Sequence, residues 1–354
     1  MSRRVQAVAG FGLAALVIGG FLSAVGPGRV LAELSGARPL PLAAGVVAVV
    51  GAFYCWSEAL RRLLAGLGQD VGGFRYRLAF MSGEFLKQVI PMGHSGGPVF
   101  VSYAVSRETD APYEESLAAA TVVEFLNIGA SILLAATGMV ALLATRDGPL
   151  GAVLVALVTG LVIAALVLCV AAVLVYTRRA LVERGVLAAA GLLRGTLGRV
   201  SARARDALAA ERIAATFGTY YSAFDTVLAE RAQVRRAVLF SLLGWALFVT
   251  PLYASFRALG EPVPYALVAF VIPVVSLVNV VPTPGGLGGF EVALAAIIVA
   301  LVGVEFPVAT AGVFLYRLIN YWLVVLLGGI ASVLFSMGLS EAPPALGPDE
   351  DPRV

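Results

Sequence analysis

Ionisable side chains are rare within the apolar stretches of this sequence, and those that occur there indicate where chemistry takes place. Glu124 and Arg317 lie in "VEFLN" and "YRLIN", and each is followed three residues later by an asparagine, Asn127 or Asn320. If these runs cross a membrane, their charged groups mark a ligand pathway or an ion pair. Two roles are open. Glu124 and Arg317 form a buried ion pair, or Arg317 grips a lipid phosphate while Glu124 or Glu291 balances its charge in the empty site.

Two interruptions rich in glycine and proline divide apolar regions near these charged residues. They read "QVIPMGHSGGPVF" at 88–100 and "VVPTPGGLGGFE" at 280–291. Non-helical backbone at membrane depth is tolerated where it lines a cavity or is buried in protein, and a half-helix that begins there directs free N–H groups at a ligand. The interruptions therefore predict a site for an anionic group, or else they only permit close helix crossing. The candidate residues are Pro91, Gly93, His94, Gly96, Gly97, Pro282, Pro284, Gly285, Gly286, Gly288 and Gly289.

Other polar residues near the interruptions have several possible roles. Glu291 begins the half-helix after the second one, where it can favour the helix dipole, bind a cationic headgroup or carry a coupling proton. Glu84 and Lys87 are three residues apart, which favours a local ion pair over direct ligand contact. His94 and Ser95 are adjacent, which is not the geometry of a nucleophile and its base, so we predict no catalytic residue.

The composition requires that membrane-spanning helices position these residues. Of 354 residues, 60% are hydrophobic and 13% are charged, which is too few charged groups for a soluble domain. We predict an all-α polytopic membrane protein with a single transmembrane domain at 1–340 and a disordered acidic tail at 341–354. With one histidine and two cysteines we expect no metal, and we expect no cofactor and no nucleic-acid partner. The stretches long enough to cross a bilayer are about 6–26, 40–60, 116–145, 150–177, 236–258 and 307–337.

The positions of the arginines predict the orientation of these spans. Arginines precede the first span, follow the second, and occur at both ends of the connection 178–235. All three regions are cytoplasmic only if the broken region 78–105 re-enters on the cytoplasmic side and the broken region 265–304 re-enters from outside. We therefore expect the chain in the cell membrane of a prokaryote, with both termini on the cytoplasmic side. Because a long span follows each hairpin, the halves 78–145 and 265–337 form an inverted-topology repeat, although their residue similarity is weak enough to arise by chance.

The connection 178–235 contains an amphipathic helix. Its apolar residues recur on one helical face, and its arginines lie on the other faces. The helix can lie on the anionic inner leaflet or pack against the cytoplasmic side of the protein itself. The apolar face consists of Ile213, Phe217, Tyr220, Phe224 and Leu228.

The chain resembles the lysylphosphatidylglycerol synthase transmembrane family of flippase-like proteins from about Leu42 to Ser336. The resemblance is carried by "FMSGEFLKQVIPMGHSGGP", "ESLAAATVVEFLN", "PTPGGLGGFEVALAAIIVALVGV" and "VFLYRLINYWLVVLLGGI". It implies movement of an anionic phospholipid or a polyprenyl-phosphate lipid between leaflets, with Glu291 and Arg317 as the functional pair of the second half. Membrane lipids are then the expected partners. An intramembrane lipid-modifying enzyme, or an assembly partner of a separately encoded lipid or glycan synthase, is the alternative.

Two departures from the family pattern lie in the first half. Many members carry an acidic residue where this chain has Pro98, and an arginine shortly afterwards where it reads "VFVSYAV". The first half therefore lacks part of a charge pair. The chain also leaves no room for the soluble aminoacyl-transferase domain of the bifunctional members, so we do not expect it to make lysylphosphatidylglycerol.

Overall fold

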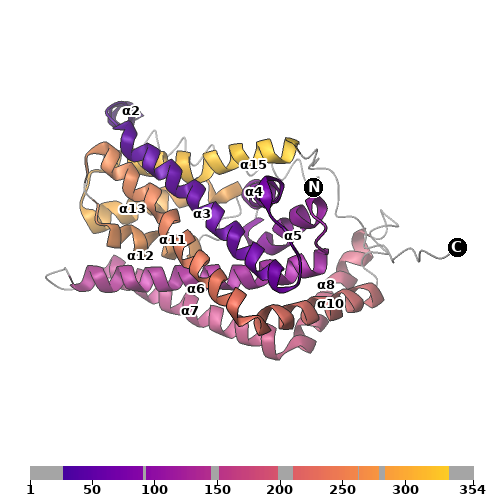
Figure 1. Cartoon of the computed structure of the whole chain (residues 1–354). Helices are drawn as coiled ribbons and strands as arrows, with labels where there is room; N and C mark the ends of the chain where they lie inside the picture. Colours follow the sequence, from indigo (N-terminus) through magenta and orange to yellow (C-terminus); the bar gives the residue numbers. More distant parts are fainter. Residues whose placement is uncertain are drawn as a thin grey trace.

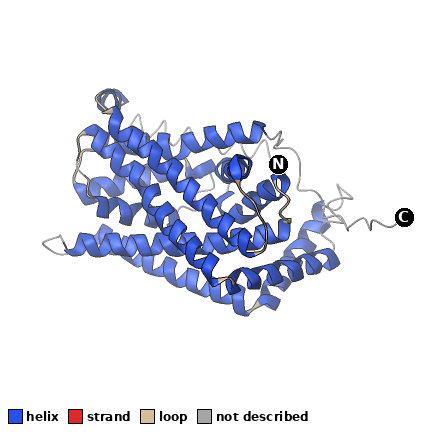
Figure 2. Ribbon diagram, in the orientation of Figure 1, coloured by secondary structure: helices blue, strands red, loops and turns tan. Residues whose placement is uncertain are grey.

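The computed structural model describes residues 27–90, 93–144, 151–197, 210–261, 263–278 and 284–334. Every regular element within these ranges is helical, which confirms the predicted all-α class (Figures 1 and 2). In chain order they are α2 (Pro27–Ser35), α3 (Pro39–Gly66), α4 (Gly73–Val89), the 3-10 turn η1 (Gly93–Gly96), α5 (Gly97–Glu108), α6 (Tyr113–Ala144), α7 (Ala152–Thr177), α8 (Arg179–Leu197), α10 (Ala210–Ala229), α11 (Arg231–Leu259), α12 (Tyr265–Val278), the 3-10 turn η2 (Pro284–Gly286), α13 (Gly289–Val302), α14 (Phe306–Arg317), the π-helical turn η3 (Leu318–Trp322) and α15 (Leu323–Leu334).

Five helical stretches in this part of the chain are long and apolar enough to cross a membrane. They correspond to five of the six predicted spans and identify the chain as a multi-pass membrane protein. The sixth predicted span, 6–26, and the predicted tail, 341–354, lie outside the described residues. The five stretches are Pro39–Gly66, Tyr113–Ala144, Leu154–Leu174, Arg231–Leu259 and Phe306–Leu334.

Both predicted interruptions divide a helix. The first separates α4 from α5 through η1, and the second separates α12 from α13 through η2. The first broken region is longer than expected, because α4 begins at Gly73 rather than at 78 and α5 ends at Glu108 rather than at 105. The arginines of the first turns of α4 do not end the helix, since Arg75 pairs with Glu108 and Arg77 pairs with Glu58.

The two halves make reciprocal contacts. Helices α3 and α11, which precede the two broken regions, pack against each other. The span that follows each break packs on the first helix of the other half, since α6 contacts α12 and α15 contacts α4. The turns η1 and η2 also contact each other. This exchange is the pattern expected of two repeats related by a pseudo-twofold axis.

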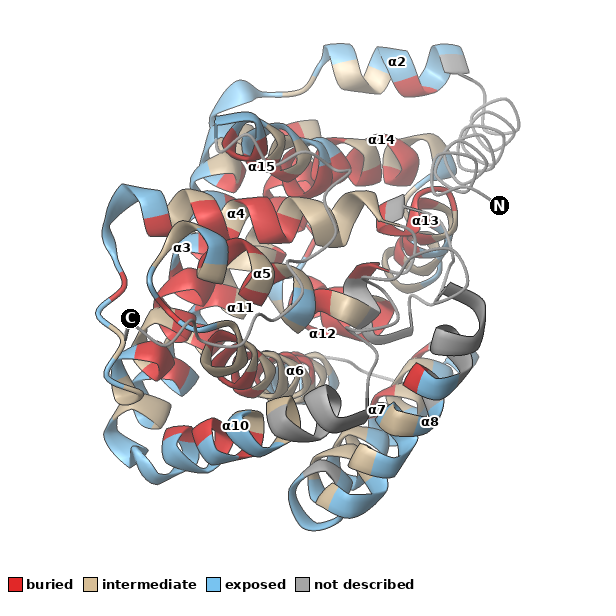
Figure 3. Ribbon diagram, turned by 90° about the vertical axis from the view of Figure 1, so that its right-hand side faces the viewer, coloured by how far each residue is buried: buried red, intermediate tan, exposed pale blue. Residues whose placement is uncertain are grey.

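Burial is high in the central helices α3, α12 and α14, whereas α7 is largely exposed (Figure 3). The exposed side chains of α7 include Val162, Leu166, Val170 and Val173. An apolar surface of this kind is stable in lipid and unstable in water. Helix α7 therefore lies at the lipid-facing perimeter of the bundle.

The amphipathic helix of the connection is α10, and it packs on α6. Phe224 of the predicted stripe is buried together with Val227, and both belong to the core formed around α3, α4 and α6. Of the two alternatives, the structure supports packing on the protein itself. Arg179 of α8 forms two hydrogen bonds of 2.8 and 2.5 Å with Asp225 of α10, and this pairing lowers the pKa of that carboxyl.

The re-entrant topology can be tested at the loops between helices. In a variant with Cys55 and Cys169 replaced, Asp70→Cys and Asp110→Cys flank the first broken region. We expect a membrane-impermeant maleimide to label both from the cytoplasmic side, because the arginine pattern predicts that this hairpin enters and leaves on that side. Glu305→Cys, after the second broken region, is expected to label from outside. Labelling of Asp70→Cys and Asp110→Cys from opposite sides would show that 73–108 crosses the membrane and would exclude the inverted repeat.

Candidate functional site

The second break has a backbone shape that depends on glycine. Gly285, Gly286 and Gly288 have φ angles of 58°, 66° and 91°, a region that other residues rarely adopt. A Cβ atom on Gly285 would also lie 2.0 Å from the Tyr321 ring. The tight turn therefore places η2 against the ring of Tyr321 in η3. At this position the glycines both permit close packing and shape the backbone of the candidate site.

Arg317 joins this break to the end of α14. Its Nε donates to Glu291 Oε1 at 2.6 Å, and its guanidinium donates to the Gly285 carbonyl at 2.8 Å. The other carboxylate oxygen of Glu291 accepts from the Gly288 N–H at 2.6 Å, as in a capping box. The guanidinium also lies over the rings of Phe290 and Tyr321, 5.0 and 4.5 Å from their centres. Both charged side chains are almost fully buried, so this half of the site is closed.

The helix that carries Arg317 changes its winding at the next residue. Residues Leu318–Trp322 form a π-helical turn, a local distortion that occurs frequently at functional sites. Asn320 lies in this turn, and its buried Nδ2 has no hydrogen-bond partner. The sequence singled out Asn320 from its spacing to Arg317, but it gave no sign of the π-helical turn.

The Glu124–Arg317 ion pair, one of the two roles considered for these residues, is not the pairing found. Arg317 pairs with Glu291 at 2.6 Å, and Glu124 lies 3.8 Å from Lys87. Because "VEFLN" and "YRLIN" have the same spacing between the charged residue and the asparagine, the sequence suggested an ion pair between Glu124 and Arg317 across the two halves. In the folded chain each charged residue of those motifs instead finds its partner near the break of its own half. Of the two carboxylates considered for balancing Arg317, the structure supports Glu291.

The charged residues of the first half gather around Lys87. Its Nζ lies 3.2 Å from Glu84, as the i, i+3 spacing predicts, and 3.8 Å from Glu124. The stem of Lys87 passes over Gly97, where a Cβ would lie 3.0 Å from Lys87 Cε. At Gly93 a Cβ would lie 2.4 Å from the Lys87 carbonyl oxygen. The small residues of the first break therefore let it fold back against the end of α4.

These charged groups line a cavity of about 390 Å³. Predicted residues in its wall are Glu84, Lys87, Gly97, Glu124 and Asn127. Sequence reasoning missed the aromatic and polar residues that complete the wall, among them Trp56, Gln88, Ser131, Trp245, Phe248 and Ser276.

The cavity receives its aromatic wall from α3 and α11, the two helices that pair at the centre of the bundle. The rings of Trp56 and Trp245 lie 5.8 Å apart, edge to face. The two tryptophans lie on separate apolar helices, and no local sequence pattern indicates that their rings contact each other. The result is a cavity with an aromatic wall and a charged wall, the composition typical of a ligand site.

The structure thus brings the two breaks together, with one half open to a cavity and the other closed. Gly93, His94 and Gly96 lie in η1, Pro284, Gly285 and Gly286 lie in η2, and Gly288 and Gly289 lie at the start of α13. Pro91 and Pro282 lie outside the described residues.

Comparison with known proteins places the chain in a family. Residues 7–328 match the family described as the lysylphosphatidylglycerol synthase TM region. The chain belongs to this family. The match covers the first four described spans, most of the fifth and both breaks, in agreement with the resemblance seen in the sequence motifs.

Individual relatives are distant. A UPF0104 membrane protein from Methanothermobacter thermautotrophicus is 23% identical over 90% of this chain and 92% of its own length. The glycosyltransferase AglD from Haloferax volcanii is 29% identical over 94% of this chain, which corresponds to 55% of the length of AglD. A UPF0104 membrane protein from Pyrococcus horikoshii is 29% identical over 34% of this chain and 36% of its own length.

The Glu291–Arg317 pair yields a stability prediction. Glu291→Ala and Arg317→Ala each leave a buried charge without its partner, and we expect each to lower the free energy of unfolding by about 3–5 kcal/mol. Glu291→Leu combined with Arg317→Met is expected to recover most of this loss. It remains about 1–3 kcal/mol below the wild type, since the Gly288 N–H and the Gly285 carbonyl lose their partners.

The coupling between the two residues is measured by a double-mutant cycle of Glu291→Leu, Arg317→Met and the double variant, each unfolded in mixed micelles with rising SDS. Glu305→Ala, an exposed carboxylate at the start of α14 without a side-chain capping bond, is the control and is expected to change stability by less than about 0.5 kcal/mol. Additive losses in the double variant would show that the two side chains do not act as a pair.

Proposed function

We propose that this protein moves a phosphate-bearing lipid, either an anionic phospholipid or a polyprenyl-phosphate lipid, between the leaflets of the cell membrane. The observation that carries the proposal is the cavity beside the first break, where Glu84, Lys87 and Glu124 face a space walled by Trp56 and Trp245. Charged side chains at membrane depth mark a pathway for a polar group. Membership of the family supports the proposal, because the family name refers to a membrane lipid.

The charges in the cavity restrict how a phosphate can enter. One ammonium faces two carboxylates, so the three groups carry a net negative charge when all are ionised. Glu84 is held at 3.2 Å and is 8% exposed, whereas Glu124 is at 3.8 Å and 35% exposed. Glu124 is therefore the partner that Lys87 exchanges for a phosphate. When it is displaced, the carboxylate of Glu124 stays in the partly exposed cavity, where it can face a cationic part of the headgroup.

Transport can be measured with purified protein in liposomes that contain fluorescent phosphatidylglycerol, phosphatidylethanolamine or a polyprenyl phosphate. We expect faster loss of fluorescence to external dithionite than in protein-free liposomes. Lys87→Gln is expected to slow the movement of anionic lipids at least tenfold, because Lys87 is the one basic residue among the described residues that line the cavity. Glu124→Gln is expected to keep or increase that movement, because it removes the competing carboxylate.

Arg257→Gln, which removes an exposed charge at the end of α11, is the matched control and is expected to transport like the wild type. Equal rates for wild type and protein-free liposomes with every lipid would refute the proposal. Equal rates for wild type and Lys87→Gln would leave transport in place but would exclude Lys87 as the phosphate-binding group.

A second candidate function rests on the similarity to AglD, whose name describes a glycosyltransferase. On this alternative the chain acts in glycosyl transfer to a lipid carrier, alone or with a separate synthase. Lipid extracts of a deletion strain distinguish the two candidates. A missing glycolipid favours the enzyme or assembly partner, whereas a normal lipid set with one lipid in the wrong leaflet favours transport.

A further inference from the structure

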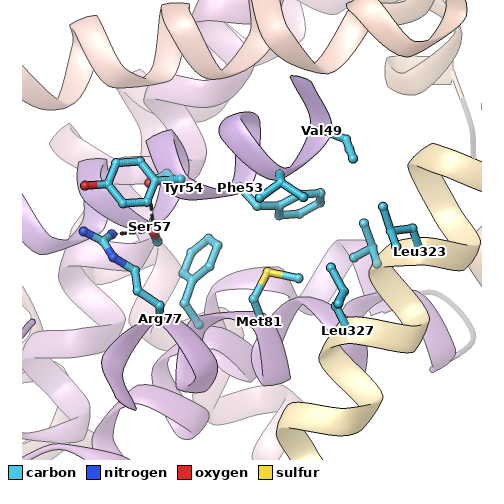
Figure 4. A pocket seen from close by; sticks show the side chains of 11 residues that line it. Val49, Phe53, Tyr54, Ser57, Arg77, Met81, Leu323 and Leu327 are labelled. Atoms are coloured by element: carbon cyan, nitrogen blue, oxygen red, sulfur yellow. Dashed lines mark hydrogen bonds between the residues drawn. The ribbon is translucent and has the colours of Figure 1, made fainter. Parts of the chain in front are cut away.

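A second pocket, of about 170 Å³, opens on the side of the bundle between α3, α4 and α15. We refer to it as the side pocket. It shares only Phe53 and Phe80 with the larger cavity. Most of its wall is aliphatic or aromatic, and Figure 4 shows Val49 and Leu323 at one end and Arg77 with Tyr54 at the other. The side pocket is therefore apolar along its length and charged at one end.

The charged end contains more positive than negative charge. Glu58 Oε2 accepts from Arg77 at 2.6 Å, and Oε1 lies 2.6 Å from Arg61 and 2.8 Å from Arg62. Three guanidiniums thus share one carboxylate, an excess of two positive charges. Arg77 also donates to the hydroxyl of Ser57, and it remains 22% exposed. An anion that approaches Arg77 therefore meets a cluster of three guanidiniums whose charge Glu58 neutralises only in part.

The rim of the side pocket faces away from the bundle. Val50 is 48% exposed and Tyr54 is 55% exposed, and the Arg77 guanidinium lies 4.4 Å from the centre of the Tyr54 ring. Tyrosine and arginine in this arrangement are typical of the level of lipid headgroups. The wall of the side pocket from Ser57 to Val49 extends along about 12 Å of α3. This length is most of the hydrocarbon layer of one leaflet, which is roughly 15 Å thick.

We propose that the side pocket holds an anionic phospholipid of the cytoplasmic leaflet, with the phosphate on Arg77 and part of one acyl chain along the apolar wall. The cytoplasmic side follows from the orientation predicted by the arginines, and that leaflet is the one rich in anionic lipid. Arginine suits the role because its planar fork binds phosphate oxygens through two N–H groups.

The bound lipid contacts α15 as well as α3 and α4. Helix α15 packs closely on α4 at Gly328, where a Cβ would lie 2.6 Å from the Met81 carbonyl oxygen. The adjacent Leu327 lines the side pocket. The lipid therefore stabilises the contact between the last helix of the second half and the first helix of the first half. This role does not depend on transport, and a variant that moves no lipid can still hold one.

Binding is tested with the full chain purified in detergent and exchanged into nanodiscs of phosphatidylcholine. Added phosphatidylglycerol with the same acyl chains is expected to raise the melting temperature more than added phosphatidylcholine. Native mass spectrometry is expected to detect one retained phosphatidylglycerol. Arg77→Gln is expected to weaken its apparent affinity about tenfold, the equivalent of one charge-assisted hydrogen bond. Glu58 keeps Arg61 and Arg62, so this variant is expected to fold.

Matched controls separate this site from general attraction to the membrane. Arg75→Gln removes the same charge two residues away, at a side chain that is 71% exposed, and is expected to bind like the wild type. Leu327→Trp fills the side pocket with every arginine in place and is expected to lose the lipid. Ile330→Trp, on the exposed face of the same helix, is expected to keep it.

Three results would overturn the proposal. They are unchanged phosphatidylglycerol binding in Leu327→Trp, an equal loss of binding in Arg75→Gln and Arg77→Gln, and equal retention of phosphatidylcholine and phosphatidylglycerol by the wild type. The Leu327→Trp comparison stays decisive if Arg77→Gln fails to fold. Because no step measures movement between leaflets, a negative result here leaves the transport proposal unaffected, and the converse also holds.

Discussion

The second break is held together by the hydrogen bonds of Arg317. A helix interrupted at membrane depth leaves N–H and carbonyl groups that no water can satisfy, and a charge at that depth needs a partner. Arg317 bonds to the Gly285 carbonyl and to Glu291, while Glu291 bonds to the Gly288 N–H. The same three bonds thus neutralise the charge and satisfy the broken backbone. Burying the Arg317 guanidinium, the Glu291 carboxylate or the broken backbone without the other two would be costly.

In the first half, the buried charge is held by weaker and fewer contacts. Lys87 has one close carboxylate, Glu84, and a second at 3.8 Å, Glu124, which is partly exposed in the cavity. Lysine carries a point charge on a flexible stem, so it can change partners without breaking a fixed fork geometry. The difference between arginine and lysine therefore matches the difference between a closed half and an open half. A site that exchanges ligands requires such a weakly held partner.

Local features were predictable from residue patterns. The long-range pair of Glu291 and Arg317 was singled out only by the family resemblance, and the packing of α3 on α11 was not predicted. The two breaks and the Glu84–Lys87 pair depend on residue types only a few positions apart, because glycine, proline and helical spacing act locally. The partner of Arg317 depends on the backbone turn at Gly285–Gly288, which brings Glu291 within 2.6 Å across 26 residues of sequence. The aromatic wall depends on the packing of α3 against α11, which no short pattern encodes. The extra turns of α4 were missed because the charges of Arg75 and Arg77 suggested a loop, whereas tertiary partners satisfy them.

The reciprocal packing of the halves constrains any movement. Helices α6 and α15 each pack on the first helix of the opposite half, so a shift of one broken region displaces the long span of the other. If the halves exchanged roles, the cavity at Lys87 would close as Arg317 opened. The chemistry is not symmetric, however, because opening the second half exposes a guanidinium with fixed hydrogen bonds, and closing the first brings two carboxylates together around one ammonium. In the proposed transport, a lipid phosphate on Arg317 would offset the cost of opening the second half.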